Sequence, residues 1–201
     1  MATTATKLTG ERLVFANAEY FHVTPYVVGS EETVGDTTYD IVDIVGDTLS
    51  FTQDENTVNA KEWEFGDTPL FETVNLGNWQ FAATCVDFRN EIMQALYGWT
   101  VQGDAIVAPN AYKDLYAVVE VGFKNEDKAI LVPKLKLNSR ATLANFKTGT
   151  GEGELAGTAY NSDFKIETTA VSAPMAFVKD GSTYTVGTKE FTVGAGTTTG
   201  E

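Results

Sequence analysis

The sequence predicts a mainly β protein, a β-sandwich or a partly open barrel with one packed α-helix. Short segments of alternating apolar and polar residues recur along the chain, and pairs such as Gly-Asp that favour turns separate them. The 18 glycines and the abundant threonine and valine favour strands and turns over helices. Only residues 85–97 repeat their apolar side chains at helical spacing.

The size and composition suit one globular domain with a core of its own. The 201 residues are 43% hydrophobic and 11% aromatic, which is typical of folded rather than disordered chains. The single cysteine, Cys85, can form no intrachain disulfide, so we expect a fold that does not depend on an oxidising compartment. The sequence has no signal-peptide pattern and no apolar run that could span a bilayer, and we expect no membrane partner.

The first 36 residues are rich in threonine and are expected to form an arm that docks on a partner or on the domain. Residues 39–45 are apolar on both faces, which predicts a strand covered on both sides. A turn at Gly46 and Asp47 precedes an alternating strand at 48–53.

A polar, flexible loop is predicted at residues 54–60. Residues 61–65 alternate again, and the Gly-Asp-Thr-Pro run at 66–69 predicts a turn. Residues 76–84 predict a strand that leads directly into the helix. One face of that strand carries Trp79, Phe81 and Ala83.

The helix at 85–97 is expected to begin at an N-cap, Thr84, and to stop at Gly98. Its apolar face must pack on a sheet, because one short helix has no core of its own. Its polar outer face is the surface to test for contacts with a neighbouring copy. That face comprises Asn90, Glu91 and Gln94.

Beyond the helix the chain is predicted to be strand again. A short strand is expected at 105–108. Residues 115–123 and 129–137 predict a hairpin, with Leu131, Leu135 and Leu137 on one face of its second strand. Later segments are a glycine-rich link at 149–157, a strand at 164–171 and a hairpin around Gly187 at 183–193.

The formal net charge of −14 is unevenly spread. Residues 31–72 contain 12 acids and one lysine, whereas residues 124–147 contain six bases and two acids. One interpretation is solubility and chance. The other is head-to-tail self-association, in which the acidic surface of one copy meets the basic surface of the next. The basic surface comprises Lys124, Lys128, Lys134 and Lys136. The acidic balance argues against tight binding of nucleic acid.

No constellation predicts catalysis, a cofactor or a metal. The only histidine, His22, has apolar and aromatic neighbours and is expected to be structural, and Cys85 is expected to be a buried structural thiol. The glycines at 149–153 lack the Gly-Lys-Ser/Thr ending of a phosphate loop. The carboxylates match no calcium loop, and we expect them to form a solvated or interface surface. These carboxylates are Asp36, Asp40, Asp43, Asp47, Asp54 and Glu55.

The order of these parts resembles that of bacteriophage major tail tube proteins. The resemblance covers residues 37–171, beginning with the strand GDTLSFTQ and the polar loop DENTVNAKEWEFGDTPL. The extended strand GNWQFAATC, a helix ending in ALYGW and the hairpin LYAVVEVGFKNEDKAILVPKLKL follow, and GTGEGELAGTAYNSDFKIETTA completes the pattern. The arm at 1–36 and a C-terminal hairpin with a flexible tail at 172–201 lie outside it.

Tail tube proteins are similar in fold to the tubes of contractile injection and type VI secretion machines. The resemblance implies a non-enzymatic virion protein, assembled in the host bacterial cytoplasm, whose rings stack into the phage tail tube. It implies that tape measure, terminator and baseplate proteins are further partners, and that DNA passes through the lumen without tight binding. A long early loop would contact the next ring. Its residues here are Asp54, Glu55, Asn56, Thr57, Asn59 and Lys61. Glu62 and Glu64 are candidates for an acidic lumen wall.

Two other classes remain open on the sequence. One is a capsid-decorating or other β-rich binding module. The other is a carbohydrate hydrolase that uses paired acids such as Asp54 and Glu55.

Overall fold

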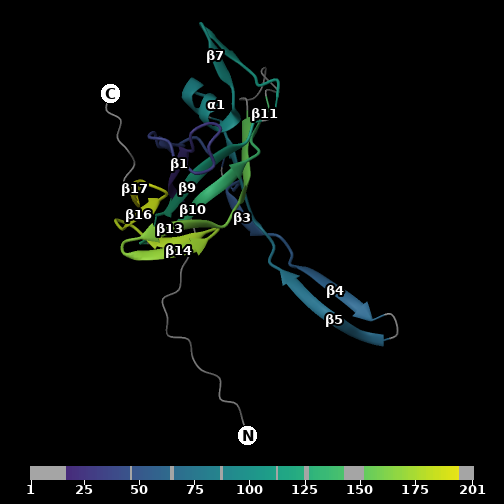
Figure 1. Cartoon of the computed structure of the whole chain (residues 1–201). Coiled ribbons are helices and arrows are strands. Elements are labelled where there is room, and N and C mark those ends of the chain that lie inside the picture. Colours follow the sequence, from purple (N-terminus) through teal and green to yellow (C-terminus); the bar gives the residue numbers. More distant parts are fainter. Residues whose placement is uncertain are drawn as a thin grey trace.

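The computed structural model describes residues 17–45, 47–63, 66–86, 88–111, 113–124, 127–142 and 152–194. It confirms the predicted class, because antiparallel strands dominate the described residues and one helix, α1 (Asn90–Tyr97), accompanies them. Figure 1 shows a body of packed strands from which one two-stranded ribbon extends.

The largest sheet has nine strands, and its main path runs β2-β1-β9-β10-β12-β6-β3. Two further strands join it, β11 beside β12 and β15 beside β10. The bounds are β1 (Ala18–Pro25), β2 (Tyr39–Asp40), β3 (Ser50–Gln53), β6 (Trp79–Cys85), β9 (Leu115–Phe123), β10 (Lys128–Leu137), β11 (Arg140–Thr142), β12 (Glu152–Ala159) and β15 (Ala176–Lys179).

Three smaller sheets complete the structure. The order of the four-stranded sheet is β14-β13-β16-β17, and two-stranded sheets are formed by β4 with β5 and by β7 with β8. The bounds are β4 (Thr57–Trp63), β5 (Gly66–Asn75), β7 (Thr100–Gln102), β8 (Ala105–Val107), β13 (Ser162–Ile166), β14 (Thr169–Ala173), β16 (Thr183–Val186) and β17 (Lys189–Thr192).

The largest sheet curls into a partly open barrel. Strands β1 and β6 are four strand spacings apart along the sheet, roughly 19 Å if the sheet were flat. The ring centroids of Phe21 on β1 and Phe81 on β6 nevertheless lie 5.6 Å apart. Ile44 forms an isolated β-bridge with Cys85, and the N–H of Val45 donates to the carbonyl of Thr84 at 2.8 Å. These contacts join the segment after β2 to the end of β6 and so bring the two sides of the sheet together. Helix α1 packs Ile92 and Leu96 into this interior.

The four-stranded sheet covers the other face of β9 and β10. Val118 and Leu131 point away from the barrel interior and pack with Phe164 and Val186 in a second core. All nine residues of β9 are therefore buried, between the two cores. This two-sided burial explains why β9 is an almost continuous apolar run.

The prediction that the helix starts at residue 85 is wrong. Strand β6 continues through Thr84 to Cys85, and Thr84 donates its N–H to the hydroxyl of Thr48 rather than capping a helix. The alternation of Phe81, Ala83 and Cys85 belongs to the strand. The predicted stop is confirmed, because Gly98 has a left-handed φ of 71° and its N–H bonds to the carbonyl of Met93.

Several other boundaries differ from the predictions. In the region 39–45 only Tyr39 and Asp40 form a strand, at the edge of the sheet. Residues 152–157 belong to β12 rather than to a link, and the remainder of the predicted link lies outside the described residues. The expected strand at 164–171 is a hairpin, β13 and β14, that turns at Glu167 with a φ of 52°.

Described strands pair across the predicted divisions at residues 36 and 171. Residues 18–25 form β1, which pairs with β9 along most of its length, while residues 1–16 lie outside the described part. Strand β14 crosses the second predicted boundary, and β13 pairs with β16. The predicted hairpin around Gly187 is confirmed as β16 and β17.

Strand β10 lies where it was predicted, but Leu131, Leu135 and Leu137 do not all lie on one face of it. Its register against β9 shifts between Val132 and Leu135, where the chain includes Pro133. This bulge reverses the alternation, so Leu135 and Leu137 face the barrel interior whereas Leu131 faces the second core.

Candidate assembly surface

The β4–β5 ribbon projects from the body of the described structure. It extends away from the body as a continuation of β3 and β6 (Figure 1). Its two strands pair with each other, from Thr57 opposite Asn75 to Trp63 opposite Gly66, and with no other described strand. The body therefore does little to hold it, and an isolated two-stranded hairpin is only marginally stable in water.

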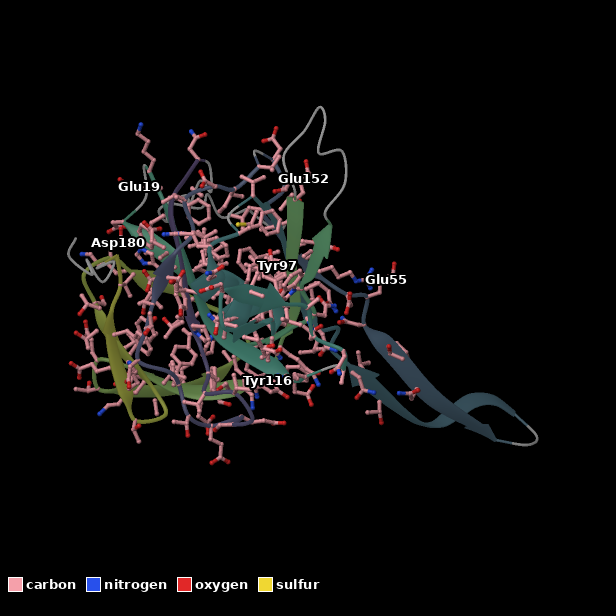
Figure 2. The ribbon with its side chains drawn as sticks, turned by 90° about the horizontal axis from the view of Figure 1, so that it is seen from above. Glu19, Glu55, Tyr97, Tyr116, Glu152 and Asp180 are labelled. Carbon is pink, nitrogen blue, oxygen red and sulfur yellow. The ribbon has the colours of Figure 1, made fainter. Side chains whose placement is uncertain are left out.

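Polar contacts fix the base of the ribbon. The N–H of Gly77 donates to Oδ1 of Asn56 at 3.0 Å, and Nε2 of Gln80 donates to Oδ2 of Asp54 at 2.7 Å. The N–H of Asp54 donates to the carbonyl of Asn78 at 2.8 Å. Asp54 and Asn56 thus set the direction in which the ribbon leaves the body, and Figure 2 shows Glu55 beside them at this base.

The ribbon exposes apolar side chains. Val58 and Val74 face each other across the two strands and are 55% and 52% exposed, and Leu76 is 77% exposed at the base. Three exposed aliphatic side chains close together on one projecting element indicate a contact surface rather than isolated surface positions.

The predicted polar loop is wrong beyond residue 56. Thr57, Asn59 and Lys61 lie in β4, and the turn expected at 66–69 lies in β5. Glu62 lies in β4 opposite Pro69, and Glu64 lies outside the described residues. A segment rich in Asn, Asp and Glu forms a ribbon here because it also contains Thr57, Val58, Thr73 and Val74, residue types that favour β structure, and Val58 pairs with Val74.

An apolar groove of about 310 Å³ lies where β3 and β6 meet β9, β10 and β15. Its lining is Leu49, Phe51, Trp79, Phe123, Ile130, Met175 and Phe177. Lysines lie near it. Ile130 of the lining pairs with Phe177, and two residues further along the same ladder Lys128 pairs with Lys179. Lys124 follows Phe123 in the sequence. The groove is therefore apolar, and these lysines lie just beyond its lining along the strands, with Asp127 and Asp180 next to two of them.

The structure does not bring the four predicted basic residues together. Lys124 and Lys128 lie at the turn end of the β9–β10 hairpin, whereas Lys134 and Lys136 lie towards the other end. Nζ of Lys134 lies 3.4 Å from a carboxylate oxygen of Glu31, and Nζ of Lys136 lies 2.6 Å from one of Asp114. Both ammonium groups also lie within 6 Å of the ring centre of Tyr116, which Figure 2 labels.

The polar face of α1 is exposed as expected. Asn90, Glu91 and Gln94 all lie at the surface, and Nε2 of Gln94 donates to the carbonyl of Asn90 at 3.2 Å. This local bond leaves the rest of the face open to solvent.

A buried polar cluster joins the two main sheets, and the sequence did not reveal it. Glu120, 5% exposed, accepts the N–H of Gly194 on Oε1 at 2.8 Å and the hydroxyl of Tyr184 on Oε2 at 3.4 Å. Nδ1 of His22 lies 3.5 Å from Oε1 of Glu120, and its ring stacks on Tyr20 with centroids 4.6 Å apart. The one acid inside the apolar run of β9 was the signal that could have indicated this cluster.

Burial keeps the phenols of this cluster neutral. Burial first, and then the charge of Glu120, raise the pKa of Tyr184 far above its usual value. The same two causes raise the pKa of Tyr20, whose hydroxyl donates to Asp180 at 2.9 Å. Both phenols therefore donate hydrogen bonds to carboxylates at any physiological pH.

The cluster lines a cleft of about 220 Å³. The hydroxyls of Thr24 and Thr38 in the cleft bond to each other at 2.7 Å. The bonds of Glu120 to Tyr184 and Gly194 suit a structural role, holding β9 to the four-stranded sheet. His22 is buried there, and Cys85 is buried in the barrel interior.

No three His, Cys, Asp or Glu side chains among the described residues gather in a way that suits a metal ion, and no helix among them is long and apolar enough to span a bilayer. No model of a known protein family matches this chain, and no curated protein sequence matches it. What the chain does must be inferred from its own geometry and chemistry.

Proposed function

We propose that this chain is a non-enzymatic structural subunit that assembles with copies of itself through the β4–β5 ribbon. The assembly is a stack of rings that forms a bacteriophage tail tube. The observation that carries this proposal is the ribbon, which has seven and ten residues in its strands and pairs with no other described strand. A long ribbon of this kind gains its stability from a partner.

The groove on a second copy offers such a partner. Residues 54–75 contain six acids and one lysine, a net charge of −5, and they carry the exposed Val58 and Val74. The groove combines an apolar floor with Lys124, Lys128 and Lys179 just beyond its lining. Apolar side chains meet apolar side chains and acids meet bases, which favours both affinity and register. Each valine buried in the contact contributes on the order of 1 kcal/mol.

Ribbon and groove are different surfaces of the same chain. Such a heterologous contact leaves each bound copy with an unused ribbon or groove, so it propagates into rings or filaments rather than ending at a dimer. Pairing between copies would also cover the edge strands β2 and β3.

The charge of the chain suits a conduit for DNA. A net charge of −14 repels phosphate, so DNA would pass through a lumen without sticking to its wall. Glu62 and Glu64 remain the proposed lumen-facing acids, and tape measure, terminator and baseplate proteins the proposed further partners in the virion tail.

The test compares the full chain with a variant in which residues 57–75 are replaced by a short Gly-Ser turn, using negative-stain microscopy and analytical ultracentrifugation. We expect rings or tubes for the full chain and monomers for the variant, with melting temperatures within about 4 °C of each other because the body is unchanged. A matched pair refines the test. Lys128→Glu should weaken assembly, and Lys165→Glu, on the exposed side of β13, should not.

A full chain that stays monomeric at high concentration would contradict the proposal. Assembly that survives removal of the ribbon would show that the ribbon is not the contact. Binding to preformed capsids without self-assembly would favour the decorating module instead.

A further inference from the structure

A third cavity, a pocket of about 290 Å³, lies between the carboxyl end of α1, the start of β9 and the link from β10 to β11. Its floor is apolar and includes Leu96, Leu115 and Leu137. Its polar side chains are those of Tyr97, Lys113, Asn138, Ser139 and Arg140. An apolar floor with a few convergent polar groups is typical of small-molecule sites.

The hydroxyl of Ser139 is buried without a partner. It is the one side-chain oxygen or nitrogen in the described part of the chain that is inaccessible to solvent and makes no hydrogen bond. Burying a hydroxyl in this state lowers the stability of the protein, so such groups are rare and call for a reason. A ligand that accepts a hydrogen bond in the pocket would supply one.

The two cations of the pocket form no ion pair with any described residue. Lys134, Lys136 and Lys189 each lie within 4 Å of a carboxylate, whereas Lys113 and Arg140 have no such neighbour among the described residues. No described Asp or Glu lines the pocket. Two unneutralised cations beside an unsatisfied hydroxyl are notable in a chain with a net charge of −14.

We propose that this pocket binds a small organic carboxylate with a short apolar body. Arg140 and Lys113 would hold the carboxylate, Ser139 would donate its hydroxyl hydrogen to it, and the leucines would cover the apolar body. The carbonyl end of α1 bears a partial negative charge, which two full positive charges outweigh. The site is separate from the ribbon and the groove, so it does not depend on the proposed assembly.

Glu154 would compete with a bound carboxylate for Arg140. It stands opposite Arg140 in the ladder of β11 and β12, so the two side chains share one face, although they make no ion pair. A ligand carboxylate must share the field of Arg140 with this acid. Removing the charge of Glu154 should therefore strengthen binding.

Ligand-observed saturation-transfer NMR on the full chain tests the proposal, because it detects weak ligands on assemblies of any size. Three probes separate the requirements: hexanoate has the carboxylate and the apolar body, hexan-1-ol only the body, and inorganic phosphate only the charge. We expect transfer to hexanoate at about 10 mM, a concentration that detects millimolar affinity, and much less to hexan-1-ol. Phosphate, which lacks carbon-bound hydrogens, is added as a competitor and should displace hexanoate poorly.

Variants locate the site. Arg140→Gln should weaken hexanoate binding about tenfold, because it removes a charged hydrogen bond, and Glu154→Gln should strengthen it about threefold. Ser139→Ala should weaken binding about threefold while raising the melting temperature of the ligand-free protein, because it removes the unsatisfied hydroxyl. Lys165→Gln, which removes a cation on another sheet, is the control and should change neither.

Three results would overturn the proposal. They are no transfer to hexanoate, equal transfer to hexan-1-ol, and binding that Arg140→Gln leaves unchanged in a variant with an unaltered melting temperature. Opposite effects of Ser139→Ala on binding and on stability would support it, since a merely structural serine would not separate the two.

Discussion

The body and the ribbon are built from similar strands but are stabilised in different ways. Strand β9 is buried on both faces, with the barrel core on one side and the second core on the other. Strands β4 and β5 pair with each other alone among the described strands. The difference indicates that the body carries the stability of the monomer and that the ribbon is kept for contacts between molecules.

The largest expected effect lies in the body. Leu135 is fully buried on β10, so Leu135→Ala removes buried apolar volume and should lower the free energy of unfolding by about 3 kcal/mol. The same change at the base of the ribbon, Leu76→Ala, should alter it by less than about 0.5 kcal/mol, because that side chain is exposed. Urea denaturation of both variants measures the contrast. Similar losses at the two positions would remove the distinction between body and ribbon.

The next effect concerns the buried acid between the sheets. Glu120 accepts a hydrogen bond on each carboxylate oxygen, whereas the amide of Glu120→Gln offers one oxygen and one NH₂ group. One donor would then face another, and we expect a loss of about 2 kcal/mol. Glu190→Gln, an exposed acid at the same cleft, is the control. Equal effects of the two changes would show that Glu120 does not join the sheets.

High pH should weaken the body through its buried phenols. The pKa of Tyr184 is raised far above its usual value by burial and Glu120, and burial raises the pKa of Tyr26 to about 12. Above pH 10 the unfolded chain loses these protons while the folded chain keeps them, so the free energy of unfolding falls as pH rises. Each such group contributes up to about 1.4 kcal/mol per pH unit.

Urea denaturation between pH 9 and pH 11.5 measures that slope. Tyr184→Phe should make it shallower, and Tyr160→Phe, at an exposed position, should not. A slope that Tyr184→Phe leaves unchanged would contradict the assignment of a neutral phenol beside Glu120.

The strands that the sequence predicted well are those whose local pattern agrees with their environment. The hairpin of β9 and β10 and the hairpin around Gly187 are examples. Strand β12 was missed because its glycines suggested a flexible link. A Cβ at Gly153 would collide with the hydroxyl end of Tyr97, so this glycine provides room for the helix rather than flexibility.

The helix start and the polar cluster were missed for a different reason. Phe88, Ile92 and Leu96 have helical spacing, and Phe81, Ala83 and Cys85 alternate as a strand, but the point where one pattern replaces the other is not marked by a capping residue. His22 and Glu120 meet only because β1 pairs with β9, and strand pairing between distant segments is not visible in a single sequence.

The smallest expected effect on stability is the most informative about function. The double change of Val58 and Val74 to threonine preserves side-chain shape and β propensity while replacing a methyl group with a hydroxyl. Because both valines are about half exposed, the free energy of unfolding should change by less than about 0.5 kcal/mol.

If the valines enter the groove of a second copy, the protein concentration needed for assembly should rise about tenfold, since the lost burial weakens each contact by on the order of 1 kcal/mol or more. The same double change at Val101 and Val107, which are exposed on the hairpin of β7 and β8 but do not pair with each other, is the control and should leave assembly unchanged. Analytical ultracentrifugation of the two double variants measures the difference. If the ribbon binds a second copy, only the change at Val58 and Val74 should weaken assembly. If the ribbon is merely exposed, the two double variants should assemble alike.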